Sequence, residues 1–85
     1  MPMKAVDPKY NRKLIGIGLN VERHRKLRGF TREGLAEKAD ESRNTIANIE
    51  NSAKPHSMAL GTLFKIADAL DIPLKKLFEF EDEKY

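Results

Sequence analysis

The sequence predicts an all-α protein, a compact bundle of five short helices. Apolar residues recur at the three- and four-residue spacing of amphipathic helices, and no segment shows the strict alternation of a strand. Glycine, proline and polar clusters interrupt this pattern often, which indicates short connections between helices. At 85 residues the chain has room for one domain with a modest core.

The N-terminal third predicts an arm followed by the first helix. Residues 1–13 hold two prolines and little apolar periodicity, so a flexible arm is expected. Asp7-Pro8 leaves an earlier helix start open, because Asp can cap a helix and Pro fits its first position. The first helix is expected from Leu14 to Arg28 and ends before Gly29, which tolerates the left-handed backbone of a helix end. Its apolar positions include Ile17, Val21 and Leu27.

The segment from Thr31 to Asn51 predicts two short helices joined by a tight turn. In the first, apolar side chains share one face. Asp40-Glu41 interrupts the pattern, and Asp tolerates a left-handed backbone better than most residues. Ser42 can restart the helix, because its hydroxyl can accept a hydrogen bond from a free first-turn N–H. The inward positions of the two helices are Leu35, Ala36, Ala39, Ile46 and Ile49.

The outward face of the second of these helices suits base recognition. It carries Arg43, Asn44, Ala47, Asn48 and Asn51. Arg can donate two hydrogen bonds to guanine, and Asn can pair with adenine. Asn is a poor helix former, so three on one face argue against a plain solvated surface. Arg43, Asn44 and Asn48 are therefore candidate base-reading residues, while Ala47 either packs against a thymine methyl or simply fills the helix.

Two further helices are expected towards the C-terminus. The fourth runs from about Met58 to Leu70. Asp71-Ile72-Pro73 breaks it, and a short fifth helix follows from Leu74 to Phe78. Residues 81–85 are expected to form an acidic tail. The core stripe of the fourth helix is Leu60, Leu63, Ile66, Ala67 and Leu70.

The charges are unevenly distributed along the chain. Residues 1–32 hold nine Lys/Arg against two acidic residues (9 − 2 = +7), and residues 33–85 hold seven against eleven (7 − 11 = −4), which together give the net charge of +3. This asymmetry fits a phosphate-facing side. Ordinary solvated helix faces explain the same charges slightly better when charge alone is considered.

Composition argues against several classes of protein. There is no cysteine, no secretory leader and no apolar run near the ~20 residues that cross a bilayer, so a cytoplasmic protein without membrane contact is expected. His24 and His56 are too far apart and too poorly supported for zinc. No nucleophile has a base nearby, and no phosphate-binding glycine loop follows a strand. We expect no catalytic residue, no metal and no cofactor.

An ordered series of residues resembles the phage-repressor and Cro-type (XRE-like) helix-turn-helix family. The series is Arg25, Gly29-Phe30-Thr31, Leu35-Ala36, Ser42-Arg43, Ile46 and Ile49-Glu50, then Leu63 to Ala67 with Leu70, and Leu74 to Phe78. It covers roughly residues 14–80. The resemblance implies a DNA-binding domain over those residues, with helices two and three as the helix-turn-helix.

The resemblance also implies a role for individual positions. Arg43, Asn44 and Asn48 match base-reading positions of the recognition helix. Arg25 and Glu50 match a structural ion pair that ties the first helix to the recognition helix. The DNA backbone would be met by Thr31, Arg32, Ser42, Asn51 and Lys54.

Four positions depart from the family pattern. Asp40-Glu41 stands where the family has Gly and an aliphatic residue, so Glu41 removes an expected core contact. Gly34 stands where a Glu would complete a capping box with Thr31. Ala59 stands where the family caps its fourth helix, which favours an earlier start at Ser57.

These features together predict a sequence-specific regulator of transcription that binds double-stranded DNA. A repressor that acts as a homodimer on a palindromic operator is expected. Two alternatives stay open: an antitoxin that also binds a toxin partner, and a protein-interaction or coactivator module without specific DNA reading. The candidate dimer surface is Leu74, Leu77, Phe78 and Phe80, for which internal packing is an equal alternative.

Overall fold

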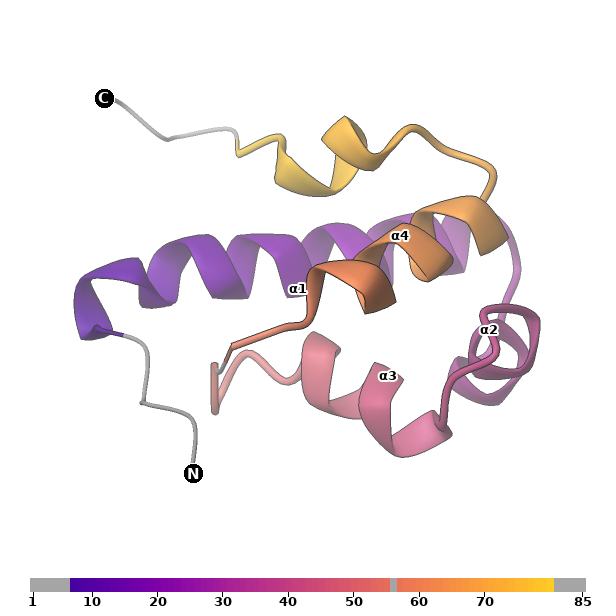
Figure 1. The fold of residues 1–85 in the computed structure, drawn as a ribbon, viewed down its shortest axis with the longest axis horizontal. Coiled ribbons are helices and arrows are strands. Elements are labelled where there is room, and N and C mark those ends of the chain that lie inside the picture. Colours follow the sequence, from indigo (N-terminus) through magenta and orange to yellow (C-terminus); the bar gives the residue numbers. More distant parts are fainter. Residues whose placement is uncertain (1–6, 56, 81–85) are drawn as a thin grey trace.

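The computed structural model describes residues 7–55 and 57–80, which form four α-helices and two 3-10 helices and contain no strand. The elements are η1 (Pro8–Tyr10), α1 (Asn11–Leu27), α2 (Arg32–Lys38), α3 (Arg43–Glu50), α4 (Leu60–Ala69) and η2 (Leu74–Phe78). In Figure 1, α1 runs through the middle of the molecule, with α3 on one side and η2 on the other. The predicted all-α class is confirmed.

The predicted number of α-helices is too high by one. The segment Leu74–Phe78 is helical over the expected residues but is a 3-10 helix, η2. The segment is short: it lies between Pro73 and Glu79, which both have extended backbone angles, and 3-10 geometry is used in short pieces.

The first helix starts earlier than Leu14. Pro8–Tyr10 form η1, in which the Asp7 carboxylate accepts a hydrogen bond from the Lys9 N–H (3.0 Å), and α1 follows at Asn11. The early start left open by Asp7-Pro8 is the one observed, and the arm prediction is wrong for residues 8–13. The remaining arm residues, 1–6, and the acidic tail, 81–85, lie outside the described residues.

Three helices end in the same way, with one left-handed residue. The φ angles are +77° at Gly29, +55° at Asp40 and +56° at Asp71. After each helix two backbone N–H groups fold back onto its last carbonyls, as in Glu41 N to Ala36 O (2.9 Å) and Asp40 N to Glu37 O (3.2 Å). This Schellman arrangement satisfies groups that a helix end leaves free.

The core lies between α1, the helix-turn-helix and the C-terminal elements. Its fully buried large side chains are Val21, Leu35, Ile46, Ile66, Leu70 and Leu77. Leu27 and Leu60, two of the predicted apolar positions, are instead exposed. Leu27 comes six residues after Val21 and so falls on another face of α1.

The fourth helix also begins later than expected. α4 starts at Leu60, with Ala59 at the N-cap and no side-chain hydrogen bond to its first turn. Ser57 does not start the helix. Leu60 is therefore the first residue of the helix and is exposed, while Met58 packs against the core before the helix begins.

Two contacts across α1 escaped the sequence analysis. Gly18 lies under α3 so closely that a Cβ there would be 2.2 Å from the Ile49 carbonyl oxygen. On another face, the Asn20 side-chain amide donates to the carbonyls of Leu77 (3.0 Å) and Glu79 (2.9 Å). These contacts seat the end of α3 and the C-terminal segment on α1.

Candidate nucleic-acid interface

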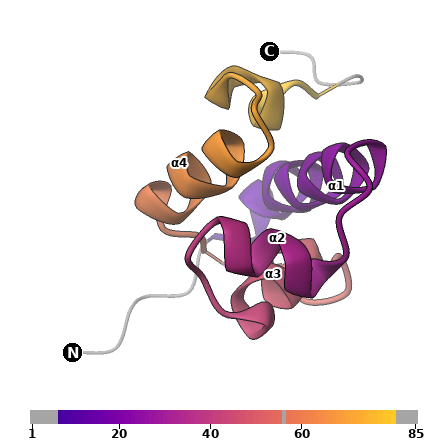
Figure 2. The same cartoon turned by 90° about the vertical axis from the view of Figure 1, so that its right-hand side faces the viewer.

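The helix-turn-helix is built from two capped helices and one left-handed turn residue. Thr31 Oγ1 accepts from the Gly34 N–H (2.9 Å) at the start of α2, and Ser42 Oγ accepts from the Thr45 N–H (3.0 Å) at the start of α3. The cap on α2 forms although Gly34 replaces the Glu of a full capping box. Figure 2 shows α2 and α3 together on one side of the molecule, with α4 and the C-terminal segment above them.

The outward face of α3 carries the residues that the sequence assigned to base reading. Ile46 and Ile49 are buried on the inner side, whereas Arg43, Asn44 and Asn48 are exposed and Ala47 is half-buried. Among the described residues the side-chain amides of Asn44 and Asn48 have no hydrogen-bond partner. These amides are therefore free to bond to an external donor or acceptor.

Arg43 has an acidic neighbour on α2. Its Nε lies 3.5 Å from Glu33 Oε1, and the two side chains are 60% and 78% exposed. Glu33 was not singled out from the sequence, because only the tight turn between α2 and α3 brings it beside the first residue of α3.

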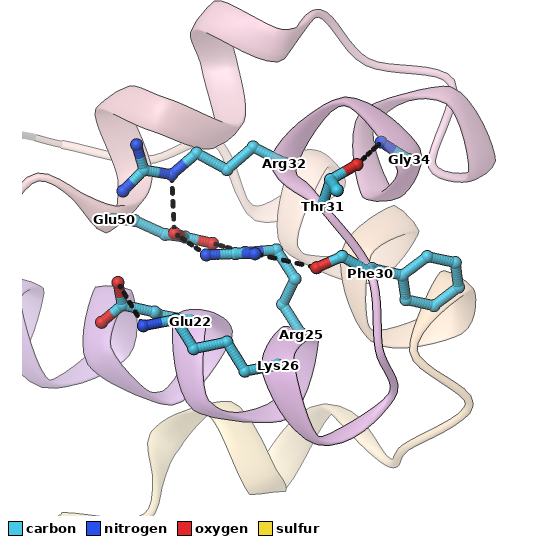
Figure 3. Close-up of polar contacts among 8 residues, drawn as sticks. All are labelled: Glu22, Arg25, Lys26, Phe30, Thr31, Arg32, Gly34 and Glu50. Carbon is cyan, nitrogen blue, oxygen red and sulfur yellow. Dashed lines mark hydrogen bonds and ion pairs between the residues drawn. The ribbon is translucent and has the colours of Figure 1, made fainter.

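The opposite end of α3 is fixed by a buried carboxylate shared by two arginines, which we call the Glu50 cluster (Figure 3). Glu50 Oε2 accepts from Arg25 Nε (2.8 Å), and Oε1 accepts from Arg25 Nη2 (3.0 Å) and Arg32 Nε (3.0 Å). Arg25 Nη1 also donates to the Phe30 carbonyl (2.8 Å). The Glu50 side chain is 0% exposed, and its hydrogen bonds raise the pKa of Arg25. The cluster contains the ion pair that the resemblance implied and adds Arg32 to it.

Arg32 thus lies between the interior and the surface. Its Nε is held by Glu50, while its side chain remains 39% exposed. In Figure 3 the two terminal nitrogens of Arg32 point away from the carboxylate. The geometry leaves these donors available for a phosphate at the N-terminal end of α2.

Glu41 has a partner that the sequence analysis did not identify. Its Oε2 accepts from Lys65 Nζ (3.0 Å) and Thr62 Oγ1 (3.4 Å) on α4, and Lys65 also donates to the Asp40 carbonyl (3.4 Å). The hydrogen bond with Glu41 raises the pKa of Lys65. A polar tether to α4 therefore takes the place of the aliphatic contact expected at this turn.

The remaining backbone-contact candidates lie at the two ends of α3 and at the start of α2. Thr31 and Ser42 are exposed N-caps, and Asn51 and Lys54 are exposed in the loop after α3. The Asn51 side-chain oxygen accepts a hydrogen bond from the Ala53 N–H (3.1 Å). The side-chain nitrogen of Asn51 is therefore the group that remains to donate to a phosphate.

The basic N-terminal region does not form one free surface. Arg25 is buried in the Glu50 cluster, Lys26 lies 3.5 Å from Glu22, and Arg28 donates to the Asp71 carbonyl (3.2 Å). Several of the positive charges therefore hold the fold together. Neither a phosphate-facing side nor ordinary solvated helix faces therefore accounts for all of the positive charges in this region.

His24 sits on α1 with its Nε2 buried and without a hydrogen-bond partner in the described structure. Burial lowers its pKa below 6.5, and the positive charges of Arg23, Lys76 and Arg28 lower it further. His56 lies outside the described residues. Among those described, no group of three His, Asp or Glu side chains is placed to hold a metal ion, and no helix is long and apolar enough to cross a bilayer.

The candidate dimer surface needs correction. Leu77 is fully buried in the protein's own core, so we withdraw it from that surface. Leu74 and Phe80 are half-buried against the core, and Phe78 is exposed. The exposed Phe64 on α4 was missed as a surface residue. It lines a shallow groove with Ile72, Pro73 and Leu74.

Comparison with known proteins agrees with this geometry. The model of the family HTH_3, described as helix-turn-helix, matches residues 21–77. A search of curated protein sequences gives no match.

Solved structures resemble the chain over most of its length. The restriction-modification controller protein C.AhdI from Aeromonas hydrophila is 27% identical, with a TM-score of 0.72 over 79% of this chain and 98% of that one. The N-terminal DNA-binding domain of SinR from Bacillus subtilis is 27% identical, with a TM-score of 0.70 over 79% and 96%. SinR, described as the master regulator for biofilm formation, also matches in a complex with DNA, at 27% identity and a TM-score of 0.68 over 74% and 98%.

Proposed function

Because the chain belongs to the HTH_3 helix-turn-helix family, of the phage-repressor and Cro type, we propose that it regulates transcription by reading a specific duplex DNA sequence with α3. It is a DNA-binding regulator and not an enzyme. Arg43, Asn44 and Asn48 would read the bases of this DNA sequence, and the protein would act in the cytoplasm.

The outward face of α3 is the observation that carries this proposal. It presents one guanidinium and two unbonded amides on a helix whose inner side is anchored by Ile46, Ile49 and the Glu50 cluster. An exposed helix of this kind fits the major groove, where Arg pairs with guanine and Asn with adenine. The likeness to SinR, whose structure was solved in complex with DNA, supports DNA as the partner.

We propose further that the protein is a repressor and binds its operator as a homodimer. The partially exposed aromatic side chains Phe64 and Phe78 and the groove beside α4 offer an apolar surface for a second copy. Two recognition helices related by a two-fold axis would then meet half-sites about 34 Å apart. Phe64→Ser is expected to give a monomer, as measured by sedimentation. The same variant is expected to bind the operator more weakly in a DNA titration. A variant of unchanged mass that keeps full affinity would refute this surface.

Selection of bound sequences from a random duplex pool tests the central claim. A palindromic consensus is the expected result, and it would show specific reading and dimeric use together. An empty selection would contradict the proposal and would favour an interaction module without specific reading. Binding should also weaken steeply with salt, because each neutralised phosphate releases counterions.

The roles of two arginines can be separated on the selected sequence. Arg43→Ala is expected to relax the preference at one base pair, because it removes a guanidinium that reads a base. Arg32→Ala is expected to weaken all DNA roughly alike, because it removes a backbone contact. Melting curves of both variants control for the bond between Arg32 and Glu50. Uniform loss across sequences in both variants would show that the assignment is wrong.

A further inference from the structure

Glu33 is an acidic side chain on the surface that would face DNA. It is the second residue of α2, and its Oε1 lies 3.5 Å from the Nε of Arg43, the first residue of α3. Both side chains are mostly exposed, so the pair adds little to folding stability. Its position is what makes it informative.

A carboxylate at this place opposes DNA binding in general. Every phosphate nearby is negative, so Glu33 weakens contacts to any duplex, whatever its sequence. The same charge also competes with phosphate for Arg43. The Glu33 carboxylate already lies beside the guanidinium of Arg43, and its negative charge repels a phosphate that would bind there. Specific binders often use such repulsive elements against the wrong partner.

The contact also leaves the reading edge of Arg43 free. Glu33 approaches Nε, and no described residue holds the two terminal nitrogens of this arginine. Those nitrogens can form the parallel pair of hydrogen bonds that guanine accepts at O6 and N7. Arg32, which precedes Glu33 on α2, is bound through its own Nε to Glu50, so it does not compete for Glu33.

We propose that Glu33 is a positioning residue for Arg43 and a determinant of DNA specificity. It orients the guanidinium with its terminal nitrogens outward and disfavours phosphate as an alternative partner. This inference rests on the proposed function, since it requires that Arg43 reads a base.

Glu33→Gln tests the proposal, and Glu37→Gln is a matched control. Glu37 lies one turn further along α2 and is also exposed, so its substitution changes the net charge by the same amount. Each variant of the 85-residue chain is titrated with three duplexes. They are the sequence selected by the wild-type chain, the same sequence changed at the base pair whose preference Arg43→Ala relaxes, and an unrelated duplex.

Glu33→Gln is expected to bind the unrelated duplex about threefold to tenfold more tightly than Glu37→Gln does. Discrimination at the Arg43 base pair is expected to fall by about threefold to tenfold, part of the value of one bidentate contact. Melting temperatures of both variants should stay near that of the wild type, because both side chains are exposed.

Two results would overturn the role of Glu33. One is equal behaviour of Glu33→Gln and Glu37→Gln on all three duplexes, which would reduce the effect to net charge. The other is a further loss of discrimination when Glu33→Gln is added to Arg43→Ala, which would show that Glu33 does not act through Arg43. If the wild-type chain selects no sequence at all, the proposed function itself fails, and this inference fails with it.

Discussion

The two ends of α3 use the same pair of residue types in opposite ways. At its C-terminal end the fully buried Glu50 binds Arg25 at 2.8 Å, and at its N-terminal end the exposed Glu33 lies 3.5 Å from Arg43. Burial removes water from the first pair, so each charge there depends on its partner. Water screens the second pair, so it adds little to folding stability, and the terminal nitrogens of Arg43 stay available for a base. One end of α3 is anchored while the other remains available for binding.

Removing the carboxylate at the buried end should have the largest effect. Glu50→Ala leaves the buried guanidinium of Arg25 without its partner, which is expected to cost about 3–5 kcal/mol of unfolding free energy. DNA binding should be lost together with stability. Denaturant unfolding measures the change, and Glu33→Ala, the same substitution at the exposed end, is the control. A Glu50→Ala protein with the wild-type melting temperature would show that the two ends do not differ as described.

The close contact between α1 and α3 at Gly18 should be the next most sensitive feature to substitution. Gly18→Ala places a Cβ 2.2 Å from the Ile49 carbonyl oxygen, so the helices must separate, and a cost of about 1–3 kcal/mol is expected. Gly61→Ala is the matched control, because nothing lies within 4 Å of a Cβ there. That substitution in α4 should instead stabilise the protein by about 0.5–1 kcal/mol through higher helix propensity. If Gly18→Ala and Gly61→Ala shift the melting temperature in the same direction, the close contact at Gly18 would be disproved.

His24 extends the comparison to a half-buried side chain whose buried Nε2 has no hydrogen-bond partner in the described structure. Its pKa in the folded protein is lowered, chiefly by burial, so the unfolded chain takes up a proton first as the pH falls. The stability that neutral His24 contributes is present above its unfolded pKa of about 6.5 and is lost as the pH drops through its folded pKa. Between about pH 7.5 and pH 5, the melting temperature should therefore fall less steeply with decreasing pH for His24→Gln than for the wild type. Parallel curves would show that His24 does not titrate in this way.

The sequence predicted those features that depend on near neighbours in the chain. Thr31 and Ser42 cap helices because each hydroxyl reaches an N–H three residues ahead. Asp40 adopts the left-handed backbone that its short polar side chain tolerates. The inner and outer faces of α3 follow from helical periodicity alone.

Features that depend on contacts between distant residues were not predicted. Glu41 looked like a lost core contact because its partner, Lys65, is on another helix. Leu77 could equally have been a surface or a core residue until the fold placed it against α1 and α4. For Gly18 the only sequence signal was a glycine within a helical pattern, which can mark close packing but does not identify the neighbour.

The contacts of Gly18 and Asn20 have a consequence for exchanging this domain between proteins. The family match begins at residue 21 and ends at residue 77, so it excludes both residues and the Glu79 carbonyl that Asn20 holds. A chain cut at those limits would lose the contacts that hold the end of α3 and the C-terminal segment on α1. A chimaera joined at those limits would keep the recognition helix, but the host protein would have to supply the residues that pack beneath α3 and hold the C-terminal segment.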